Sequence, residues 1–393
     1  MVDKNKCIIF NTKLDTKSIE LLYEQIGTEK TDLFFAKNIS DSDLFIIPKV
    51  IQFVATWYRQ SKIGKLIFEV SAEKESLKEL YKLDFFFTII TFCWKGDITN
   101  HKNENLKLLL FELNTDYFKN MRNQDFPGQK SILSCFDHLS SQKGLLSTFY
   151  SDEQFITNEF LFENAINKSL KKVLSLNREL KVNNISRVYD EIVAVIYELM
   201  KNTDDWGRTD INNVTYNPNT RGLYLKFHRR KIDFYNKSNE DVEGLSDYFS
   251  NSTFVVNNLN EAYFLEISVF DTGLGFIERN KGLLSEISLS QKAEIITKCL
   301  IQNFTSSTGR DKLTKGIGLY RIMNILNNKG LFNVRSENIS LFRNLVKNPF
   351  YENEDIVLYD WLKNSNTEYT AHSKVCGSVV SVLIPISNLA NNE

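Results

Sequence analysis

One predicted helix carries the residues best suited to chemistry in this 393-residue chain. Within residues 188–206, the apolar side chains recur at the spacing of one buried helical face: Ile192, Val195, Ile196 and Leu199. Glu198, Asn202 and Asp205 form a second stripe on an adjacent face. A carboxylate and an amide one turn apart can hold a hydrated divalent cation and a water. Taken alone, the stripe is more typical of the solvated border of an amphipathic helix.

A strand that ends in a glycine-containing turn is the second chemical signal. Residues 265–270 alternate as in a half-buried strand, and Asp271 follows at the tip. Gly273 and Gly275 allow the backbone to turn sharply and to approach a ligand closely. A carboxylate at this position can accept a hydrogen bond from an exocyclic amine such as that of adenine. An ordinary turn is the simpler interpretation of this stretch by itself.

Two glycines that open a later helix are the third signal. Gly316 and Gly318 lie in the stretch KGIGLY, residues 315–320, at the start of a predicted helix. The apolar face of that helix consists of Leu319, Ile322, Met323 and Leu326. Free N–H groups and the positive dipole end at a helix start bind anions, so a triphosphate fits here. The sequence contains no Walker A motif, which disfavours a P-loop site.

Together and in this order, the three stretches resemble the GHKL (Bergerat-fold) ATPase superfamily, which includes gyrase B subunits, heat-shock chaperones, MutL proteins, histidine kinases and anti-sigma-factor kinases. ELMKN, residues 198–202, resembles the N box of that family. DTGLGF, residues 271–276, resembles the first glycine box, and KGIGLY resembles the second. GSV, residues 377–379, resembles the closing Gly-Thr motif, with Ser378 retaining the hydroxyl. The resemblance covers residues 155–387, and four boxes in the correct order are specific.

The resemblance implies a role for each matching residue, with ATP and Mg²⁺ as cofactors. It implies that Asn202 coordinates Mg²⁺ and that Glu198 is the general base in hydrolysing members. It also implies that Asp271 reads adenine, with the Ser378 hydroxyl as its partner. The remaining implied nucleotide contacts are Asp205, Gly273 and Gly275 on the adenine side, and Gly316, Gly318 and Leu319 on the phosphate side.

The segment between the glycine boxes, residues 277–314, corresponds to the mobile ATP lid of the family. Its end is rich in hydroxyls and cations, and Lys315 follows directly. The residues there that could contact a γ-phosphate are Thr308, Arg310, Lys312 and Lys315. They fit equally well as ordinary solvated side chains, and the sequence leaves both interpretations open.

The elements that must position these residues predict an α+β protein with two domains. Residues 1–150 are predicted to form a smaller N-terminal α/β domain for sensing or partner binding, faintly similar to STAS-type regulatory domains. Residues 151–393 are predicted to form the ATP-binding domain, a Bergerat-type sandwich of a mixed sheet with helices on one face. Residues 236–260 and 343–375 are interpreted as insertions, because loops of this length are usually functional or disordered.

Apolar periodicity predicts the remaining elements. Predicted strands are residues 6–10, 65–70, 107–113, the pair 222–227 and 231–235, and the final stretch GSVVSVLIP. Predicted helices are residues 16–26, 44–59, 76–83 and 154–181, the last as one long helix with Phe155, Phe160, Leu161, Ala165, Ile166 and Leu170 in register. The run at residues 85–92 fits either a buried strand or the end of a helix.

Composition narrows the function classes. A net charge of −1 provides no global basic surface for nucleic acid and no polybasic membrane anchor. The longest apolar run, residues 85–94, is about half the length that a membrane helix needs. The five cysteines are scattered, which argues against a disulfide framework or a thiolate zinc site and fits a reducing cytoplasm. The N-terminus lacks the layout of a signal peptide.

Three functions fit these motifs and the resemblance they carry. The first is an ATPase, converting ATP and water to ADP and phosphate, that acts as a conformational switch on a protein partner; the retained Glu198 favours it. The second is a Ser/Thr protein kinase of the anti-sigma-factor type, and the third is a non-catalytic nucleotide-gated interaction module. A histidine kinase is disfavoured, because residues 154–181 contain no histidine and His138 lacks the usual flanking pattern. Family members often form homodimers, which extends to this chain as an expectation.

Overall fold

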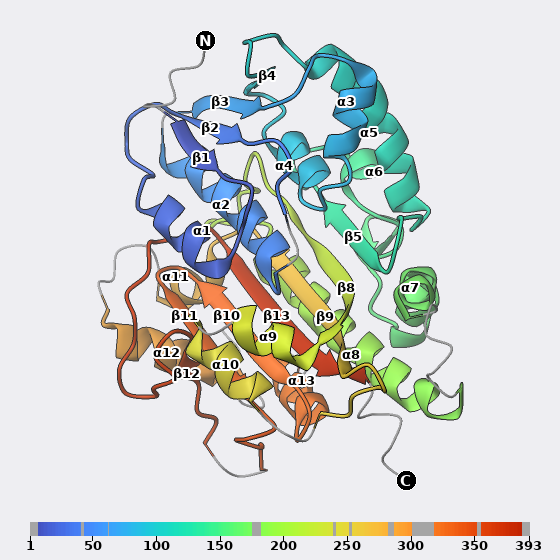
Figure 1. Cartoon of the computed structure of the whole chain (residues 1–393), viewed down its shortest axis with the longest axis vertical. Helices are drawn as coiled ribbons and strands as arrows, with labels where there is room; N and C mark the ends of the chain where they lie inside the picture. Colours follow the sequence, from blue (N-terminus) through green and yellow to red (C-terminus); the bar gives the residue numbers. More distant parts are fainter. Residues whose placement is uncertain are drawn as a thin grey trace.

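A parallel sheet, a larger antiparallel sheet and the helices that cover them make up this protein in the computed structural model (Figure 1). The structure describes residues 7–40, 43–61, 63–174, 182–238, 241–250, 254–281, 287–300, 318–351 and 355–386. This mixture of helices and sheets agrees with the predicted α+β class. Within those ranges, every helix is too short or too polar to cross a membrane.

The N-terminal sheet is parallel, and its spatial order β1-β2-β3-β4 is the order of the chain. Its strands are Cys7–Phe10, Thr31–Phe35, Ile63–Phe68 and Asp97–Asn100. Parallel neighbours require crossover connections, which helices supply here: α1 (Thr16–Tyr23), α2 (Ile46–Gln60), α3 (Lys74–Leu80) and α4 (Phe86–Phe92). The predicted strands at residues 6–10 and 65–70 and the helices at 16–26, 44–59 and 76–83 are confirmed with shifted ends. The ambiguous run at residues 85–92 is the helix α4.

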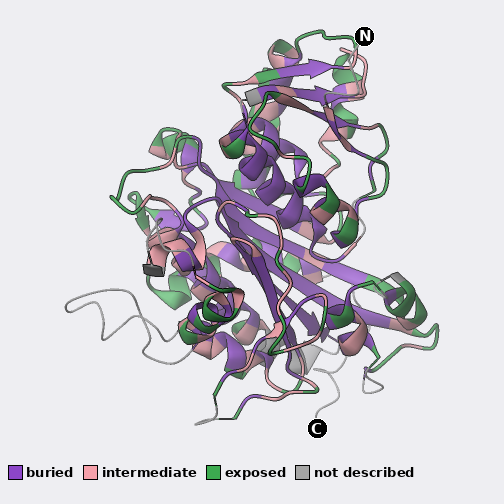
Figure 2. Cartoon of the chain, turned by 90° about the vertical axis from the view of Figure 1, so that its left-hand side faces the viewer, coloured by how far each residue is buried: buried purple, intermediate pink, exposed green. Residues whose placement is uncertain are grey.

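The larger sheet has the order β12-β11-β10-β13-β9-β8-β5, and its neighbouring strands are antiparallel. In that order the strands are Tyr359–Asp360, Ile339–Asn344, Leu331–Ser336, Ser378–Pro385, Glu261–Asp271, Arg221–Lys231 and Lys130–Cys135. The predicted final strand is β13. Both faces of β9 and β13 are buried, as the dark ribbons through the centre of Figure 2 show.

Helices cover both faces of the larger sheet. The helices α7 (Glu159–Leu174), α8 (Val182–Trp206) and α13 (Gly318–Leu326) contact one face, whereas α2, α9 (Ile232–Ser238) and α10 (Glu243–Phe249) contact the other (Figure 1). The prediction of a mixed sheet with helices on one face is therefore wrong for the described strands. An apolar second face requires a cover, and the N-terminal helix α2 is part of that cover.

Helix α2 joins the N-terminal sheet to the larger sheet. It contacts α1, α4 and β3 on one side and β9 and β13 on the other, and its residues are buried along nearly the whole helix. The strand β5 also precedes the boundary predicted near residue 150, yet it pairs with β8 in the larger sheet. One hydrophobic core runs through both parts. The larger sheet therefore extends across the predicted boundary.

The predicted strand at residues 107–113 is wrong, because α5 (Lys107–Arg122) occupies it. Leu110 and Leu113 are buried, whereas Leu108 and Phe111 are 85% and 65% exposed. This spacing places one helical face against β5. The run contains leucine, phenylalanine and glutamate but no β-branched residue, so its local preference also favours a helix.

The predicted pair of strands at residues 222–227 and 231–235 is also wrong. β8 continues as one strand to Lys231, and α9 follows it. The polar residues between the two predicted strands instead contact carboxylates of β9. His228 Nε2 lies 2.8 Å from Glu266 Oε2, and Arg229 Nε donates to Glu261 Oε2 at 2.8 Å.

The predicted long helix at residues 154–181 begins later. Gln154–Phe155 forms β7, which pairs with β6 (Tyr150–Ser151), and α7 starts at Glu159. Phe160 and Leu161 are exposed, and the buried face of α7 consists of Phe162, Ile166, Ser169, Leu170 and Val173. Phe155 belongs to β7, and the face of α7 that packs into the core is rotated relative to the predicted one. Residues 175–181 lie outside the described ranges.

Both predicted insertions contribute to a second hydrophobic cluster on the sheet face under α9 and α10. Tyr248 and Phe249 of α10 and Trp361, which follows β12, are fully buried there. They pack beside Phe264 and Phe342 of the sheet. These segments are therefore part of the cover of the sheet. The remaining helices are α6 (Ser141–Gly144), α11 (Gly275–Lys281) and α12 (Leu289–Cys299).

Candidate functional site

Helix α8 is the element along which the other predicted site segments lie. Its predicted apolar face is confirmed, because all members are buried: Ile192, Val195, Ile196 and Leu199. Glu198, Asn202 and Asp205 are half-buried at the border of that face. The helix contacts β8 and β9 of the sheet and runs beside α13, which the second glycine box opens.

Asp271 lies at the end of β9, in the middle of the larger sheet. In register, Arg221 of β8 lies on one side of it and Ser378 of β13 on the other. Its Oδ1 accepts a hydrogen bond from the Gly273 N–H at 2.8 Å. Burial raises the pKa of Asp271 from 3.8 to about 6, while the Gly273 amide and the Arg59 and Arg221 cations act in the opposite direction. The carboxylate is thus buried and strongly desolvated.

The turn after Asp271 packs against the end of α8. Gly207 directly follows that helix, and a Cβ built on it would lie 2.7 Å from Asp271 Cβ. A Cβ on Gly273 would lie 2.7 Å from the Gly207 carbonyl oxygen. Both positions therefore require glycine for close backbone approach. This contact brings the first glycine box to the C-terminal end of the N-box helix.

Two serines hold the other side of the same turn. The Phe276 N–H donates to Ser336 Oγ at 3.2 Å, and Ser336 Oγ lies 3.2 Å from Ser378 Oγ. The hydroxyl of Ser378 thus pairs with Ser336, while its backbone amide lowers the pKa of Asp271. Gly275 opens α11 with a φ of 80° beside Ser336. The first glycine box and the GSV stretch therefore meet at the head of β13.

Gly377 is the most constrained residue of this junction. Its φ is 67°, and a Cβ would lie 2.0 Å from the Asp271 carbonyl oxygen. We expect Gly377→Ala to destabilise the fold by more than the roughly 1–2 kcal/mol of a left-handed alanine, because overpacking adds about 1–3 kcal/mol. Thermal unfolding of the variant and the wild type measures this.

Gly128→Ala is the matched control for that substitution. Gly128 has a similar φ of 78°, but a Cβ there would meet nothing within 4 Å. It should therefore show only the cost of the left-handed backbone. Equal losses of stability in the two variants would mean that the close approach at Gly377 has no energetic weight.

Glu198 lies toward the opposite end of the site, nine residues before Gly207 on the chain. Arg321 Nη1 of α13 donates to Glu198 Oε1 at 3.3 Å, and the same guanidinium donates to both Glu159 carboxylate oxygens at 2.7 and 2.9 Å. Burial raises the pKa of Glu198, and the Lys201 and Arg321 cations oppose that shift. The carboxylate is thus linked to α13 through Arg321, which lies in the first turn of that helix.

Asn202 stands between the two ends of the site, one turn after Glu198. Its Nδ2 is buried and has no hydrogen-bond partner among the described residues. A buried polar group without a partner costs free energy, so this amide is suited to a ligand or an ordered water. Asp205 lies one turn further, where its charge acts on Tyr197.

The structure places only part of the second glycine box. Gly318 opens α13, and Leu319 is buried as its predicted apolar face requires. The predicted phosphate contacts Thr308, Arg310, Lys312, Lys315 and Gly316 lie outside the described residues.

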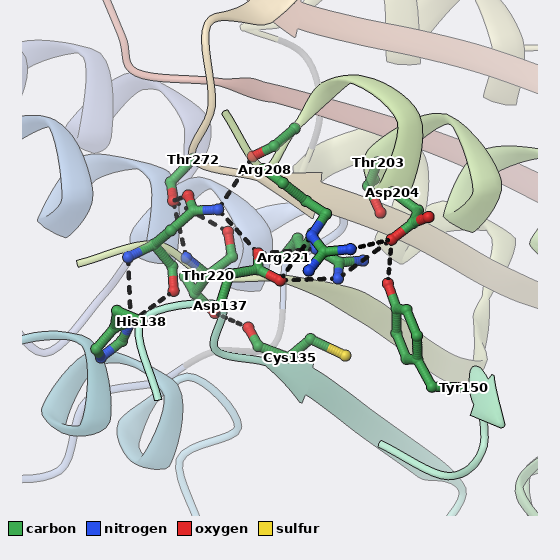
Figure 3. A network of polar contacts seen from close by, with 12 residues as sticks. Cys135, Asp137, His138, Tyr150, Thr203, Asp204, Arg208, Thr220, Arg221 and Thr272 are labelled. Atoms are coloured by element: carbon green, nitrogen blue, oxygen red, sulfur yellow. Dashed lines mark hydrogen bonds and ion pairs between the residues drawn. The ribbon is translucent and has the colours of Figure 1, made fainter. Parts of the chain in front are cut away.

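A buried ionic network behind Asp271 was not predicted from the sequence (Figure 3). Arg221 donates two hydrogen bonds of 2.9 Å to Asp137, and both side chains are 0% exposed. Arg208 bridges Asp137 and Asp204 at 3.2 Å each, and the Tyr150 hydroxyl donates to Asp204 at 2.5 Å. The network therefore joins the end of β5, the end of α8 and the start of β8.

The network continues into the first glycine box. Asn219 Nδ2 donates to Asp137 at 2.9 Å and to the Gly207 carbonyl at 3.1 Å. Its Oδ1 accepts from the Thr272 hydroxyl at 2.6 Å, and the Thr220 N–H donates to that hydroxyl at 3.0 Å. The residue after Asp271 is thereby fixed to the end of α8. The available sequence signal was charged and polar residues at the ends of apolar strands. The Asn219–Asp137, Arg221–Asp137 and Thr272–Asn219 pairs, however, each join residues more than 50 positions apart.

Within the described ranges, the chain thus brings together α8, the turn that follows Asp271, the GSV stretch and the start of α13. No family model, curated protein or solved structure matches this chain.

Proposed function

We propose that this chain binds Mg-ATP in a Bergerat-type site and hydrolyses it, acting as a nucleotide-driven switch coupled to its N-terminal α/β part. One observation carries the proposal. The segments of the three predicted boxes lie along one helix, with the Asp271 turn against its end at Gly207 and the start of α13 beside Glu198. Nine helical residues span about 13 Å, which suits an extended nucleoside triphosphate.

The chemistry at each end supports a nucleotide bound with its adenine at Asp271 and its phosphates near Glu198. The desolvated carboxylate of Asp271 is an acceptor for an exocyclic amine. At the other end, a partly buried Glu198 with a raised pKa is suited to accept a proton from an attacking water. Positioning and charge neutralisation dominate phosphoryl transfer. We propose Gly316, Gly318, Lys315, Lys312 and Thr308 as the phosphate-binding residues, because they precede or open α13.

The residues present fit a magnesium ion held jointly with the nucleotide. Asn202 would hold it through its amide oxygen, while its buried Nδ2, which has no partner within the described ranges, would be free to donate to the nucleotide or to a water. When bound, the ion supplies charge neutralisation on the phosphates. The described part of the chain has no group of three or more His, Cys, Asp or Glu side chains that could hold a metal. A hydrated magnesium ion bound mainly by phosphates does not require such a group.

The first test is ATP binding by the wild type and by Asp271→Asn. We expect a loss of affinity of roughly 10- to 100-fold, corresponding to about 1.5–3 kcal/mol for a hydrogen bond to a charged group. Isothermal titration calorimetry with Mg-ATP measures it. The matched control is Asp116→Asn on the exposed face of α5, which should bind as the wild type does. A wild type that binds no nucleotide, or a variant that binds normally, would contradict the proposal.

The stability of the fold should depend on pH differently in Asp271→Asn and in the wild type. Folding raises the pKa of Asp271 from 3.8 to about 6, so the folded chain holds this proton more tightly than the unfolded chain. The contribution of this carboxyl to stability is therefore present below pH 3.8 and is lost as the pH rises through about 6. The difference corresponds to about 3 kcal/mol. As the pH rises between those values, the wild type should lose this stability and Asp271→Asn should not. Thermal unfolding at several pH values measures the difference.

For the N-terminal part, we propose a regulatory role toward a protein partner. The strands β1 to β4 form a parallel sheet separate from the larger one, and the STAS-like resemblance stays a prediction. Transfer of phosphate to a partner hydroxyl, rather than to water, would favour the kinase alternative. A cytoplasmic location and a homodimeric state likewise stay predictions.

A further inference from the structure

Helix α2 carries a polar stripe that points at the predicted nucleotide site. Gln52, Thr56 and Arg59 recur at the spacing of one helical side. Gln52 Nε2 donates to the Cys376 carbonyl at 3.3 Å, and the Cys376 N–H donates to Thr56 Oγ1 at 3.0 Å. The stripe therefore holds the backbone just before Gly377, at the head of β13.

Arg59 extends the stripe to the first glycine box. Its guanidinium donates to the backbone carbonyl of Thr272 and, at 3.0 Å, to that of Pro218. The guanidinium also stacks on the Tyr216 ring, with 4.3 Å from Cζ to the ring centroid. Thr272 directly follows Asp271, so this one side chain fixes the backbone of the turn from the side opposite α8.

These contacts are suited to positioning rather than to general packing. Buried backbone carbonyls need donors, and the donors to Thr272 and Pro218 come from a helix more than 150 positions earlier in the chain. An arginine satisfies both carbonyls with one planar group. A lysine would retain the charge but could not reproduce this geometry.

The charged groups around the turn at Asp271 come from α2, β8 and α11. Arg59 of α2 and Arg221 of β8 are the cations that act on Asp271. The Arg59 cation also acts on the phenol of Tyr216 and the thiol of Cys376, both of which Glu278 of α11 opposes. Loss of the Arg59 charge should therefore raise the pKa of Asp271, because one of its two stabilising cations is removed.

We propose that α2 is the element through which the N-terminal part sets the adenine end of the site, with Arg59 as the positioning residue for the turn that carries Asp271. This inference rests on the proposed nucleotide function. It adds a residue outside the four boxes and a physical route between the two parts of the chain.

The experiment uses the full-length chain with Arg59→Ala, Arg59→Lys and the control Gln60→Ala. Gln60 is the neighbouring exposed residue of α2, and among the described residues its amide donates a hydrogen bond to the Lys374 carbonyl. One readout is the pKa of Asp271, followed by ¹³C NMR of labelled aspartate and assigned with Asp271→Asn. The other is Mg-ATP affinity by calorimetry as a function of pH.

We expect Arg59→Ala to raise the pKa of Asp271 and to weaken ATP binding about tenfold, the equivalent of losing one or two hydrogen bonds. Its binding should require a higher pH than that of the wild type. Arg59→Lys should keep the pKa close to that of the wild type and still weaken binding, whereas Gln60→Ala should change neither. An unchanged pKa and an unchanged affinity in Arg59→Ala would overturn the inference.

The two proposals fail in distinguishable ways. If the wild type binds no ATP but Arg59→Ala still shifts the pKa of Asp271, the nucleotide function is wrong and the positioning role of Arg59 stands. If the wild type binds ATP and Arg59→Ala binds it equally well with the same pKa, the nucleotide function stands and the route through α2 is wrong.

Discussion

Replacing Glu198 by alanine is expected to leave ATP affinity within a few-fold of the wild type while reducing phosphate release by about 10²- to 10⁴-fold, the usual effect of removing a general base. The surroundings of the Glu198 carboxylate give the reason. Burial raises the pKa of Glu198 toward the range in which a base is effective, and the Arg321 cation at 3.3 Å opposes that shift. Calorimetry measures binding, and a coupled phosphate assay measures turnover.

The wild-type rate should also fall as the pH decreases through the pKa of Glu198, which lies above 4.5. A carboxyl that has taken up a proton cannot accept another from water. This acid limb should be absent from the residual activity of Glu198→Ala. The profile thus separates a chemical role from a loss of folding.

Glu191→Ala is the matched control. Glu191 lies two turns earlier on α8 and pairs with Lys329, just after α13, so its removal also breaks an ion pair between these elements. Turnover close to that of the wild type is expected. If Glu191→Ala were as inactive as Glu198→Ala, the effect would come from the packing of α8. A wild type that binds ATP without releasing phosphate would instead call for a search for phosphate on a partner.

Replacing Arg221 by alanine is expected to destabilise the fold by about 3–5 kcal/mol, the usual cost of leaving one member of a buried ion pair alone. Asp137 would remain fully buried, with Arg208 and Asn219 as its remaining contacts. The same change would loosen the turn after Asp271, which the network holds through Asn219. Urea unfolding followed by intrinsic fluorescence measures the loss.

Arg208→Ala and a double replacement are the comparisons that interpret this loss. The Arg208 side chain is 34% exposed and contacts the same aspartates, so about 1 kcal/mol is expected for it. Removing both charges with Arg221→Met and Asp137→Asn should recover much of the stability, because no uncompensated charge remains buried. Equal costs for Arg221→Ala and Arg208→Ala would contradict the network as a source of stability.

The spacing of apolar residues predicted an element correctly where a single periodic apolar face is buried. The apolar stripe of α8 and the apolar face of α13 are buried as predicted. β9 and β13 also form where predicted, because long alternating or continuous apolar runs bounded by glycines leave few alternatives. The order of the boxes along the chain was likewise readable, and with it the expectation of a carboxylate at a strand tip beside glycines.

For short apolar runs, the sequence pattern did not distinguish helix from strand or show where a strand ends. The run at residues 107–113 is helical because Leu110 and Leu113 have β5 to pack against. The charged end of β8 stays in the sheet because Glu266 and Glu261 lie opposite it. Both outcomes depend on partners distant in the chain, which periodicity does not report.

Local sequence patterns predicted the residues suited to chemistry and the elements that carry them: Glu198 and Asn202 on α8, and Asp271 at the end of a strand. How these residues are held became visible in the tertiary structure. It placed Arg321 against Glu198, the Asp137–Arg221 pair behind Asp271, and Arg59 of α2 on the carbonyl of Thr272. The physical reason is that these contacts join residues more than 80 positions apart. Their pairing follows from how the sheet and the helices pack.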